Sequence, residues 1–325
     1  MRVFSGVRPT GELHIGNYLG AIKQWVELQK EAECIFCIVD LHAITTPYEN
    51  RELQNNISEL VIAYLAAGLN PEESTFFVQS RIKEHTELAW LLGTIAPLGE
   101  LQRMTQFKEK SKKHPEYINA GLLNYPLLMA SDILLYQTDL VPVGKDQEQH
   151  IELARILARK FNQKFGQALK EPKAFIPKAG ERIMSLQNPK KKMSKTDDPR
   201  GCIGLFDNPE DIKRKVMGAV TDPGRKITYN PDSKPGISNL LTIYSLFSEK
   251  TIKELEKNFE NKGYADFKKS LADLLILSLE NFRQKRKEFQ TRQVYIQEIL
   301  NRGANKAQAL AISTMKNVKK KMGLI

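Results

Sequence analysis

The chain has 325 residues, of which 41% are hydrophobic and 27% charged, and this composition excludes a disordered, collagen-like or coiled-coil protein and allows two domains with cores of their own. Its net charge is +11, and the excess is concentrated: residues 1–200 carry a net +2 and residues 201–325 a net +9, so we expect the second part to meet a polyanion. No apolar run approaches the roughly 18 residues that a membrane span needs, and residues 1–6 lack the apolar core of a signal peptide, which predicts a cytoplasmic location and no membrane partner.

The three cysteines, Cys34, Cys37 and Cys202, are too few and odd in number for a disulfide framework. The spacing of Cys34 and Cys37 is also found in redox and zinc pairs. Both lie in an apolar run, residues 34–39, that is typical of a buried strand, and residues three apart on a strand point to opposite faces. We therefore expect structural cysteines and no metal site.

Short apolar strands alternate with amphipathic helices up to about residue 166. The pattern predicts strands at 3–7, 34–39, 75–78 and 140–143, and helices at 15–30, 51–67, 126–136 and 146–165. This alternation implies an α/β domain with a Rossmann-like, doubly wound parallel sheet covered by helices. Ligands of such sheets bind at the carboxyl ends of the strands.

The pattern of apolar and polar residues changes after Leu186. Residues 188–201 hold almost no apolar side chain and are bounded by helix breakers, which predicts an exposed, mobile loop. Beyond this loop the pattern predicts helices at 209–219, 238–247, 250–258 and 264 to about 290, and a terminal helix that ends in residues 316–321. We expect two domains, an α/β domain at 1–200 and a basic, all-helical domain at 201–325, with the last helix able to pack back on the first.

The turn after the first strand contains Gly11 and Gly16 and opens onto a helix. Backbone N–H groups and the helix dipole at such a place hold phosphate, and His14 and Asn17 can donate to phosphate or ribose oxygens. The spacing matches neither GxGxxG nor a Walker loop, which disfavours a nicotinamide enzyme and a P-loop ATPase. The alternative is a plain turn in which His14 and Asn17 cap the helix.

The loop residues Lys192, Ser194, Lys195 and Thr196 are a second candidate. Two lysines beside small hydroxyl residues suit a clamp that stabilises negative charge on a departing pyrophosphate. A solvated basic linker is the alternative.

A third candidate is the helix that carries Tyr125, Met129, Asp132, Ile133 and Tyr136 on one face. A carboxylate among apolar groups is costly unless a donor meets it, and an indole N–H or a phenol O–H would be that donor. The alternative is that an internal Arg or the backbone satisfies Asp132.

The fourth predicted strand leads into Gly144, Lys145, Asp146 and Gln147 at the start of a helix. Asp146 can accept from ribose hydroxyls, and Gln147 can bind the ammonium or carboxylate group of an amino acid. The alternative for Asp146 is a plain N-cap.

Residues 14–17 near the N-terminus and 192–196 at the end of the α/β part resemble the HIGH and KMSKS signatures of class I aminoacyl-tRNA synthetases, in that order and context. The resemblance sharpens to the bacterial tryptophanyl-tRNA synthetases over essentially the whole chain. The strings that carry it are 4–6, 16–21, 38–45, 99–100, 104–110, 120–123, 125–126, 132–136, 141–144, 146–147 and 234–241.

The resemblance implies a role for each matching residue. Asp132 would accept the indole N–H, and Tyr125 and Gln147 would hold the amino group. The indole ring would pack against Phe4, Met129, Val141 and Val143. The ATP contacts would come from Arg8, Pro9, Thr10, Gly16, Asn17, Gly144, Lys145, Asp146, Ile183, Lys192, Met193, Ser194, Lys195 and Thr196. Catalysis would rest on Asn17, Lys110, Lys192 and Lys195, and Mg²⁺ would travel with ATP without a protein cage.

Three positions depart from the usual pattern of that family. Arg8 stands where Gln is common, which adds a charge beside the amino-acid carboxylate or the α-phosphate. Thr196 replaces the last Ser of KMSKS and keeps the hydroxyl. Asn17 replaces the second His of the HIGH signature, a replacement that is usual in this family, so it contributes a neutral amide.

The resemblance implies that the chain activates L-tryptophan with ATP, releases pyrophosphate and transfers the acyl group to the 3′ end of tRNA(Trp) in translation. The helical domain would bind the anticodon region, the partners would include a second copy in a homodimer, and DNA would not be bound. Three alternatives stay open: a tyrosyl-tRNA synthetase, a synthetase-like RNA-binding protein without catalysis, and a small-molecule nucleotidyltransferase.

Overall fold

A computed structural model of the chain describes residues 1–9, 11–105, 107, 112, 116, 118–144, 147–175, 182–195 and 198–325. Five of the residues assigned above to ATP or to catalysis lie outside these described residues. They are Thr10, Lys110, Lys145, Asp146 and Thr196.

A parallel sheet forms the centre of the α/β part. Within the described residues it contains β1 (Arg2–Val7), β2 (Glu33–Ile38), β3 (Ser74–Val78), β4 (Leu140–Pro142) and β5 (Lys173–Phe175), in the order β3-β2-β1-β4-β5. Every pairing is parallel, and Val3 of β1 lies opposite Cys34 on one side and Leu140 on the other. The predicted α/β class with a parallel sheet is therefore confirmed. The strand order reverses beside β1, so the turn that follows β1 lies at the switch point where ligands of such sheets bind.

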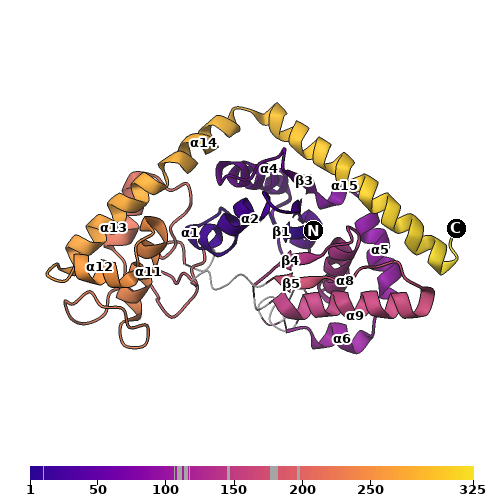
Figure 1. Cartoon of the computed structure of the whole chain (residues 1–325), viewed down its shortest axis with the longest axis horizontal. Coiled ribbons are helices and arrows are strands. Elements are labelled where there is room, and N and C mark those ends of the chain that lie inside the picture. The colour runs from indigo at the N-terminus through magenta and orange to yellow at the C-terminus, as the bar shows by residue number, and fades with distance from the viewer. Residues whose placement is uncertain are drawn as a thin grey trace.

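Helices cover both faces of this sheet (Figure 1). They are α1 (Ile15–Asn17), α2 (Lys23–Leu28), α3 (Asp40–Ala43), α4 (Asn50–Ala66), α5 (Glu84–Gly93), α6 (Leu98–Arg103), α8 (Ala120–Leu134) and α9 (Glu148–Phe165), with a π-helical turn η1 (Tyr18–Ile22) and a 3₁₀ turn η2 (Gln79–Arg81). The two faces have separate cores, and Cys34 packs in one core while Cys37 packs in the other. The expectation that these cysteines point apart is confirmed. Burial raises the pKa of the Cys34 thiol to about 11, as expected of a structural cysteine.

The second part of the described chain consists of helices (Figure 1, orange to yellow). They are α10 (Pro209–Met217), α11 (Pro235–Ser248), α12 (Ile252–Asn258), α13 (Tyr264–Ser278), α14 (Glu280–Gln290) and α15 (Gln293–Met322). The single helix expected from 264 to about 290 is wrong, because it is interrupted at Leu279, which is fully buried. The interruption lets α13 pack on α10 while α14 reaches α4 of the α/β part.

The terminal helix α15 returns to the α/β part and lies along the edge strand β3 and beside α5 (Figure 1). Gly303 permits this contact, since a Cβ atom at that position would lie 1.8 Å from the carbonyl oxygen of Phe76 in β3. The main chains of helix and strand therefore meet directly.

Helix α8 begins at Ala120, six residues before the predicted start at Pro126. The side chain of Asn119 caps it by accepting from the backbone N–H of Leu122 at 2.9 Å. Proline is common in the first turn of a helix, so Pro126 read as a start signal, but it lies inside the helix. The sequence patterns also missed α5, α6 and β5.

Candidate active site at the carboxyl end of the sheet

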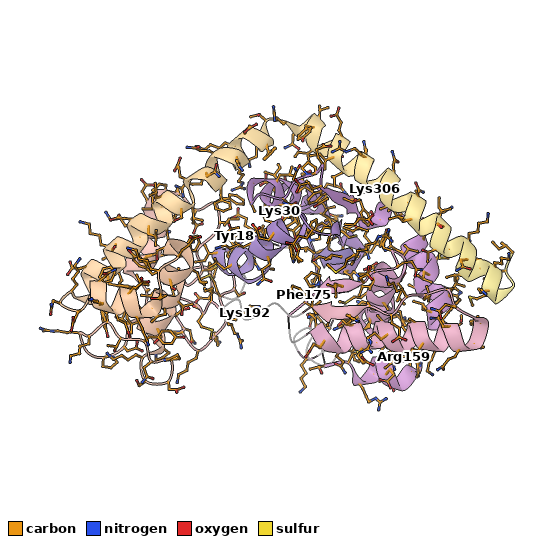
Figure 2. The ribbon with its side chains drawn as sticks, viewed as in Figure 1. Tyr18, Lys30, Arg159, Phe175, Lys192 and Lys306 are labelled. Carbon is orange, nitrogen blue, oxygen red and sulfur yellow. The ribbon has the colours of Figure 1, made fainter. Side chains whose placement is uncertain are left out.

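Backbone hydrogen bonds join the first signature to the chain that follows the lysine loop. The N–H of Ile15 donates to the carbonyl of Ile203 at 3.0 Å, and the N–H of Leu205 donates to the carbonyl of Leu13 at 2.8 Å. The chain just after the lysine loop thus pairs with the start of the first signature. In Figure 2, Lys192 is labelled between the helical part and Phe175 of β5.

His14 and Asn17 cap each other at the start of α1. The backbone N–H of Asn17 donates to Nδ1 of His14 at 3.3 Å, and the N–H of His14 donates to Oδ1 of Asn17 at 3.0 Å. Burial and the nearby Lys192 ammonium lower the pKa of His14 to about 4, so this ring is neutral at pH 7. The capping alternative is therefore present, and its two bonds use neither Nε2 of His14 nor Nδ2 of Asn17.

Gly16 lies against this cap. A Cβ atom there would lie 2.9 Å from Nδ1 of His14 and 3.7 Å from Cβ of Ile183. Only glycine leaves the cap undisturbed, and the same contact shows that the first signature lies beside Ile183, which was expected to touch the adenylate.

The lysine loop begins as a short hairpin. Met193 donates its N–H to the carbonyl of Ile183 at 3.0 Å, and Ser185 donates to the carbonyl of Lys191 at 2.8 Å. Lys192 is exposed and Ser194 half-buried, whereas Met193 is buried in the core beside Ile183. The expectation of a wholly exposed loop is wrong at Met193, because this side chain anchors the hairpin to the α/β part.

Asn239 of α11 holds the other side of the hairpin. Its Oδ1 accepts from the N–H of Met184 at 2.9 Å, and its Nδ2 donates to the carbonyl of Met184 at 2.9 Å. The side chain is buried. Sequence reasoning placed Asn239 in a resembling string but gave it no role, since nothing in a local pattern links residues 184 and 239.

The residues expected to bind the indole ring come together on one face of the sheet. Phe4 of β1 and Val141 of β4 are buried, and Met129 of α8 and Val143 are half-buried in the same core. Phe4 also stacks on Tyr136 with ring centroids 5.6 Å apart. The structure thus brings strand and helix residues from positions 4 to 143 into one apolar cluster.

Asp132 is buried at the edge of this cluster and accepts three hydrogen bonds. Gln79 Nε2 and His85 Nδ1 reach its Oδ1 at 2.7 and 2.6 Å, and His42 Nε2 reaches its Oδ2 at 2.8 Å. Burial by itself would raise the pKa of Asp132, but the bonds from the two histidines outweigh it and hold this pKa below its usual value. The carboxylate is therefore ionised.

These three donors were missed. The alternative weighed from the sequence was an internal Arg or the backbone, and the donors are instead two imidazoles and an amide. His85 is fixed in turn, since its Nε2 lies 2.7 Å from the hydroxyl of Tyr136. The available signal was the rule that a buried carboxylate needs donors, but that rule does not say which residues supply them.

Tyr125 and Arg8 lie close to each other. The hydroxyl of Tyr125 lies 3.0 Å from Nε2 of His150. Arg8 donates from Nη2 to Oγ1 of Thr46 at 2.8 Å, while its buried Nε has no hydrogen-bond partner among the described residues. Burial lowers the pKa of Arg8, so the guanidinium is a desolvated cation that an anionic ligand would stabilise.

The remaining described candidates include Pro9, Gly144, Gln147 and Lys195. Pro9 is buried and Gly144 is exposed, and the N–H of Gln147 donates to the carbonyl of Gly144 at 2.9 Å just before α9. Lys195 forms an ion pair with Glu12.

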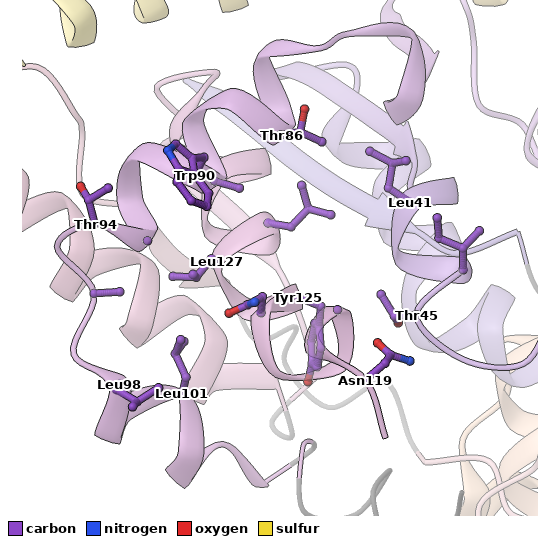
Figure 3. A pocket seen from close by; sticks show the side chains of 17 residues that line it. Leu41, Thr45, Thr86, Trp90, Thr94, Leu98, Leu101, Asn119, Tyr125 and Leu127 are labelled. Atoms are coloured by element: carbon purple, nitrogen blue, oxygen red, sulfur yellow. The ribbon is translucent and has the colours of Figure 1, made fainter. Parts of the chain in front are cut away.

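An apolar cavity of about 740 Å³ lies next to the site, between α3, α5, α6 and α8. Figure 3 shows Trp90, Leu98, Leu101 and Leu127 around it, with Tyr125 at the wall shared with the site. Trp90 is 76% exposed and Leu98 59% exposed. Such a patch is typical of a surface that another molecule covers.

Comparison with known proteins identifies the family of the chain. The family model described as tRNA synthetases class I (W and Y) matches residues 1–280. The chain belongs to this family. The synthetase is 51% identical to the tryptophan–tRNA ligase of Caldanaerobacter subterraneus, over all of its own length and 98% of that protein.

Solved structures agree with this assignment. Tryptophanyl-tRNA synthetase from Mycoplasma pneumoniae superposes with a TM-score of 0.88 at 38% identity, covering 99% of this chain and 97% of that one. The Campylobacter jejuni tryptophanyl-tRNA synthetase complexed with ADP and tryptophan gives 0.86 at 35% identity, covering 99% and 100%. The resemblance drawn from the sequence is confirmed, and so is the Rossmann-like class I fold.

Two further findings concern only the described residues of the synthetase. Among them, no helix is both long and apolar enough to cross a membrane. Nor does any group of three or more His, Cys, Asp or Glu side chains there gather in a way that could hold a metal ion.

Proposed function

We propose that this synthetase activates L-tryptophan with ATP and transfers it to the 3′ end of tRNA(Trp). A carboxylate oxygen of tryptophan attacks the α-phosphorus of ATP, the bond to the β-phosphate breaks, and pyrophosphate leaves with tryptophanyl-adenylate as the product. The terminal ribose of the tRNA then takes the acyl group and AMP leaves. The observation that carries the proposal is the backbone pairing of residues 13–15 with residues 203–205, which holds the chain just after the lysine loop against the first signature at the switch point of the sheet.

Catalysis requires no protein nucleophile. The site positions two substrates in line, and fixed donors stabilise the charge that moves onto pyrophosphate. Lys192 and Lys195 supply two cations from the loop, and Asn17 offers a neutral amide. Lys110 is assigned to the triphosphate by family resemblance alone. ATP brings its own Mg²⁺ as part of the substrate.

Tryptophan recognition rests on Asp132. Its Oδ2 receives one hydrogen bond, from His42, and Oδ1 receives two. A carboxylate oxygen has room for a second donor, so the indole N–H is assigned to Oδ2. Tyr125 and Gln147 hold the amino group, and Arg8 supports the carboxylate or the α-phosphate.

The basic helical part, residues 201–325, is assigned to tRNA in the cytoplasm. Its net charge of +9 suits contacts with phosphates, which supply most of the affinity for nucleic acid and weaken with salt. Raising the salt concentration is expected to weaken tRNA binding while barely changing the use of ATP.

The apolar face around Trp90 and Leu98 is assigned to a second copy of this chain, in a homodimer. An exposed face of this kind next to Tyr125 suits a self-association surface. Trp90→Glu is expected to shift the protein from dimer to monomer in sedimentation velocity. Leu277→Glu on α13 is the matched control, because Leu277 is 75% exposed away from this face. A wild-type protein that sediments as a monomer refutes the assignment.

The activity is tested by pyrophosphate exchange into ATP, with each amino acid offered alone and without tRNA. Exchange with tryptophan alone is expected. Exchange with tyrosine would mean that the pocket is misassigned, and no exchange with any amino acid would favour a non-catalytic RNA-binding protein.

Two loop variants separate chemistry from binding. Lys192→Ala and Lys195→Ala are expected to lower the exchange rate by roughly 100-fold or more while tryptophan affinity changes little. Equal losses in rate and tryptophan affinity would contradict the clamp.

A further inference from the structure

The two lysines of the loop face different surroundings. Lys192 lies close enough to His14 to lower the pKa of that ring. Lys195 instead lines a separate cavity of about 470 Å³, between the turn after β1, α4 and α14, where it is paired with Glu12. One lysine therefore faces the first signature, while the other is held by a carboxylate.

Glu12 has a second cationic neighbour. Nη2 of Arg286 in α14 lies 3.9 Å from Oε1 of Glu12, and the same guanidinium is bound to Glu59 of α4 at 2.8 Å. Arg286 also lies over the ring of Phe206, 4.8 Å from its centroid. Glu12 thus stands between a cation from the catalytic loop and a cation from the helical part.

Burial by itself would raise the pKa of Glu12, but Lys195, Arg286 and Lys215 hold it below the usual value. The carboxylate stays ionised and competes for Lys195 with any other anion within reach. The pair is weak, because both side chains are about half exposed to solvent. A triphosphate carries several negative charges and displaces such a partner.

We propose that Glu12 is a positioning residue for the ATP step. Glu12 holds Lys195 in the nucleotide-free enzyme, and it pairs with Arg286 instead when the phosphates of ATP draw Lys195 away. The proposal rests on the proposed function, in which Lys195 serves the triphosphate. Glu12 then restrains ATP binding, and Arg286 lessens that restraint by offering Glu12 a replacement partner.

The first experiment compares Glu12→Gln with the wild type in pyrophosphate exchange. Without the carboxylate Lys195 is no longer held, so the KM for ATP is expected to fall about threefold to fivefold, while kcat and the KM for tryptophan stay unchanged. The matched control is Glu27→Gln, which removes an exposed Glu–Lys pair with Lys30 at 2.9 Å and leaves every constant as it was. An unchanged or raised KM for ATP in Glu12→Gln overturns the proposal, and so does a lower kcat.

A second comparison tests the exchange of partners. Arg286→Gln removes the replacement partner, so the KM for ATP is expected to rise when Glu12 is present and to stay constant in the Glu12→Gln background. An equal effect of Arg286→Gln on the KM for ATP in both backgrounds refutes the idea that Glu12 exchanges Lys195 for Arg286. Arg286→Gln also removes the ion pair with Glu59. Thermal melting of each variant shows whether a rise in the KM for ATP comes from the destabilisation that this second loss causes.

Equilibrium binding of ATP without any amino acid keeps the two proposals distinguishable. Absence of exchange with tryptophan in the wild type would refute the proposed function. The binding of ATP to wild type and Glu12→Gln would still show whether Glu12 restrains it.

Discussion

His14 is a buried, neutral imidazole at the start of α1, and its titration couples protein stability to pH. Its pKa of about 4 in the folded chain lies below the usual 6.5. Between these pH values the imidazole of His14 is protonated in the unfolded chain and neutral in the folded chain. The free energy of unfolding therefore falls as the pH drops from 6.5 towards 4, and this loss is absent above pH 6.5.

The size of this loss gives a prediction. It amounts to about 2 kcal/mol at pH 5. Urea denaturation at pH 7 and pH 5 measures it, and His14→Asn is expected to lose about 2 kcal/mol less than the wild type over this range, because Asn caps the helix without titrating. Identical losses in both proteins would contradict the assignment to His14.

We expect Asp132 to select the amino acid, but less by its charge than the sequence led us to expect. With phenylalanine bound it would still keep the three donors Gln79, His85 and His42. The penalty for a missing indole N–H is then one hydrogen bond at a carboxylate that is already satisfied, rather than a bare buried charge.

Asp132→Asn is expected to reduce discrimination between tryptophan and phenylalanine by roughly 10-fold, because the amide presents N–H groups where an acceptor is needed. The ratio of kcat/KM for the two amino acids in pyrophosphate exchange measures this. His85→Asn serves as a comparison, since it disturbs the same network without touching Oδ2. If Asp132→Asn keeps the full ratio, the indole contact is elsewhere.

At the scale of elements, the lysine loop is held at its base rather than free along its length. Met193 packs into the α/β core on one side, and Asn239 of α11 pairs with the backbone of Met184 on the other. The base of the loop is therefore held by the α/β part on one side and by α11 on the other.

Asn239→Ala removes both bonds to Met184, the neighbour of Ile183, which we propose contacts the nucleotide. We expect the KM for ATP to rise by about 10-fold and the KM for tryptophan to stay within twofold. The matched control is Asn162→Ala, which removes a similar amide contact with the backbone of Leu169, 2.7 Å from its Nδ2, far from the loop. Loss of tryptophan and ATP binding in equal measure would show that Asn239 serves folding alone.

The spacing of apolar residues and the positions of helix-breaking residues predicted the strands near β1 to β4 and most of the longer helices, because the apolar patterns of these elements are strong. The break at Leu279 was not predictable, since Leu279 continues the helical pattern and only the packing of α13 on α10 and α14 on α4 separates the two helices. In the candidate site, Asp132 was singled out because a carboxylate among apolar groups is costly, and the lysines because two of them flank a small hydroxyl residue on a loop. The partners His42, Gln79, His85 and Asn239 were not, because they meet these residues only through the fold.

At the scale of the whole molecule, α15 ties the end of the chain to the sheet. Its contact with β3 depends on the missing side chain of Gly303. Gly303→Ala is expected to lower the free energy of unfolding by about 3 kcal/mol, since the added methyl group forces the helix away from the strand. Thermal and urea denaturation measure the loss.

Gly99→Ala is the control for this prediction. A Cβ atom at Gly99 in α6 meets no atom within 4 Å, so stability is expected to stay constant or rise slightly, as alanine favours a helix. If Gly303→Ala is as stable as Gly99→Ala, helix and strand do not meet as closely as described.

The closure of the sheet edge by α15 has a consequence for how the protein is made. Strand β3 is complete once residue 78 has left the ribosome, but the helix that covers it begins at residue 293. From residue 78 until α15 has been made, the nascent chain carries an uncovered edge that includes Phe76 and Phe77, which is a template for pairing with other chains. Chaperone protection during translation, or rapid synthesis and release of α15, would matter more for this protein than for one whose sheet edge is covered by its own N-terminal half.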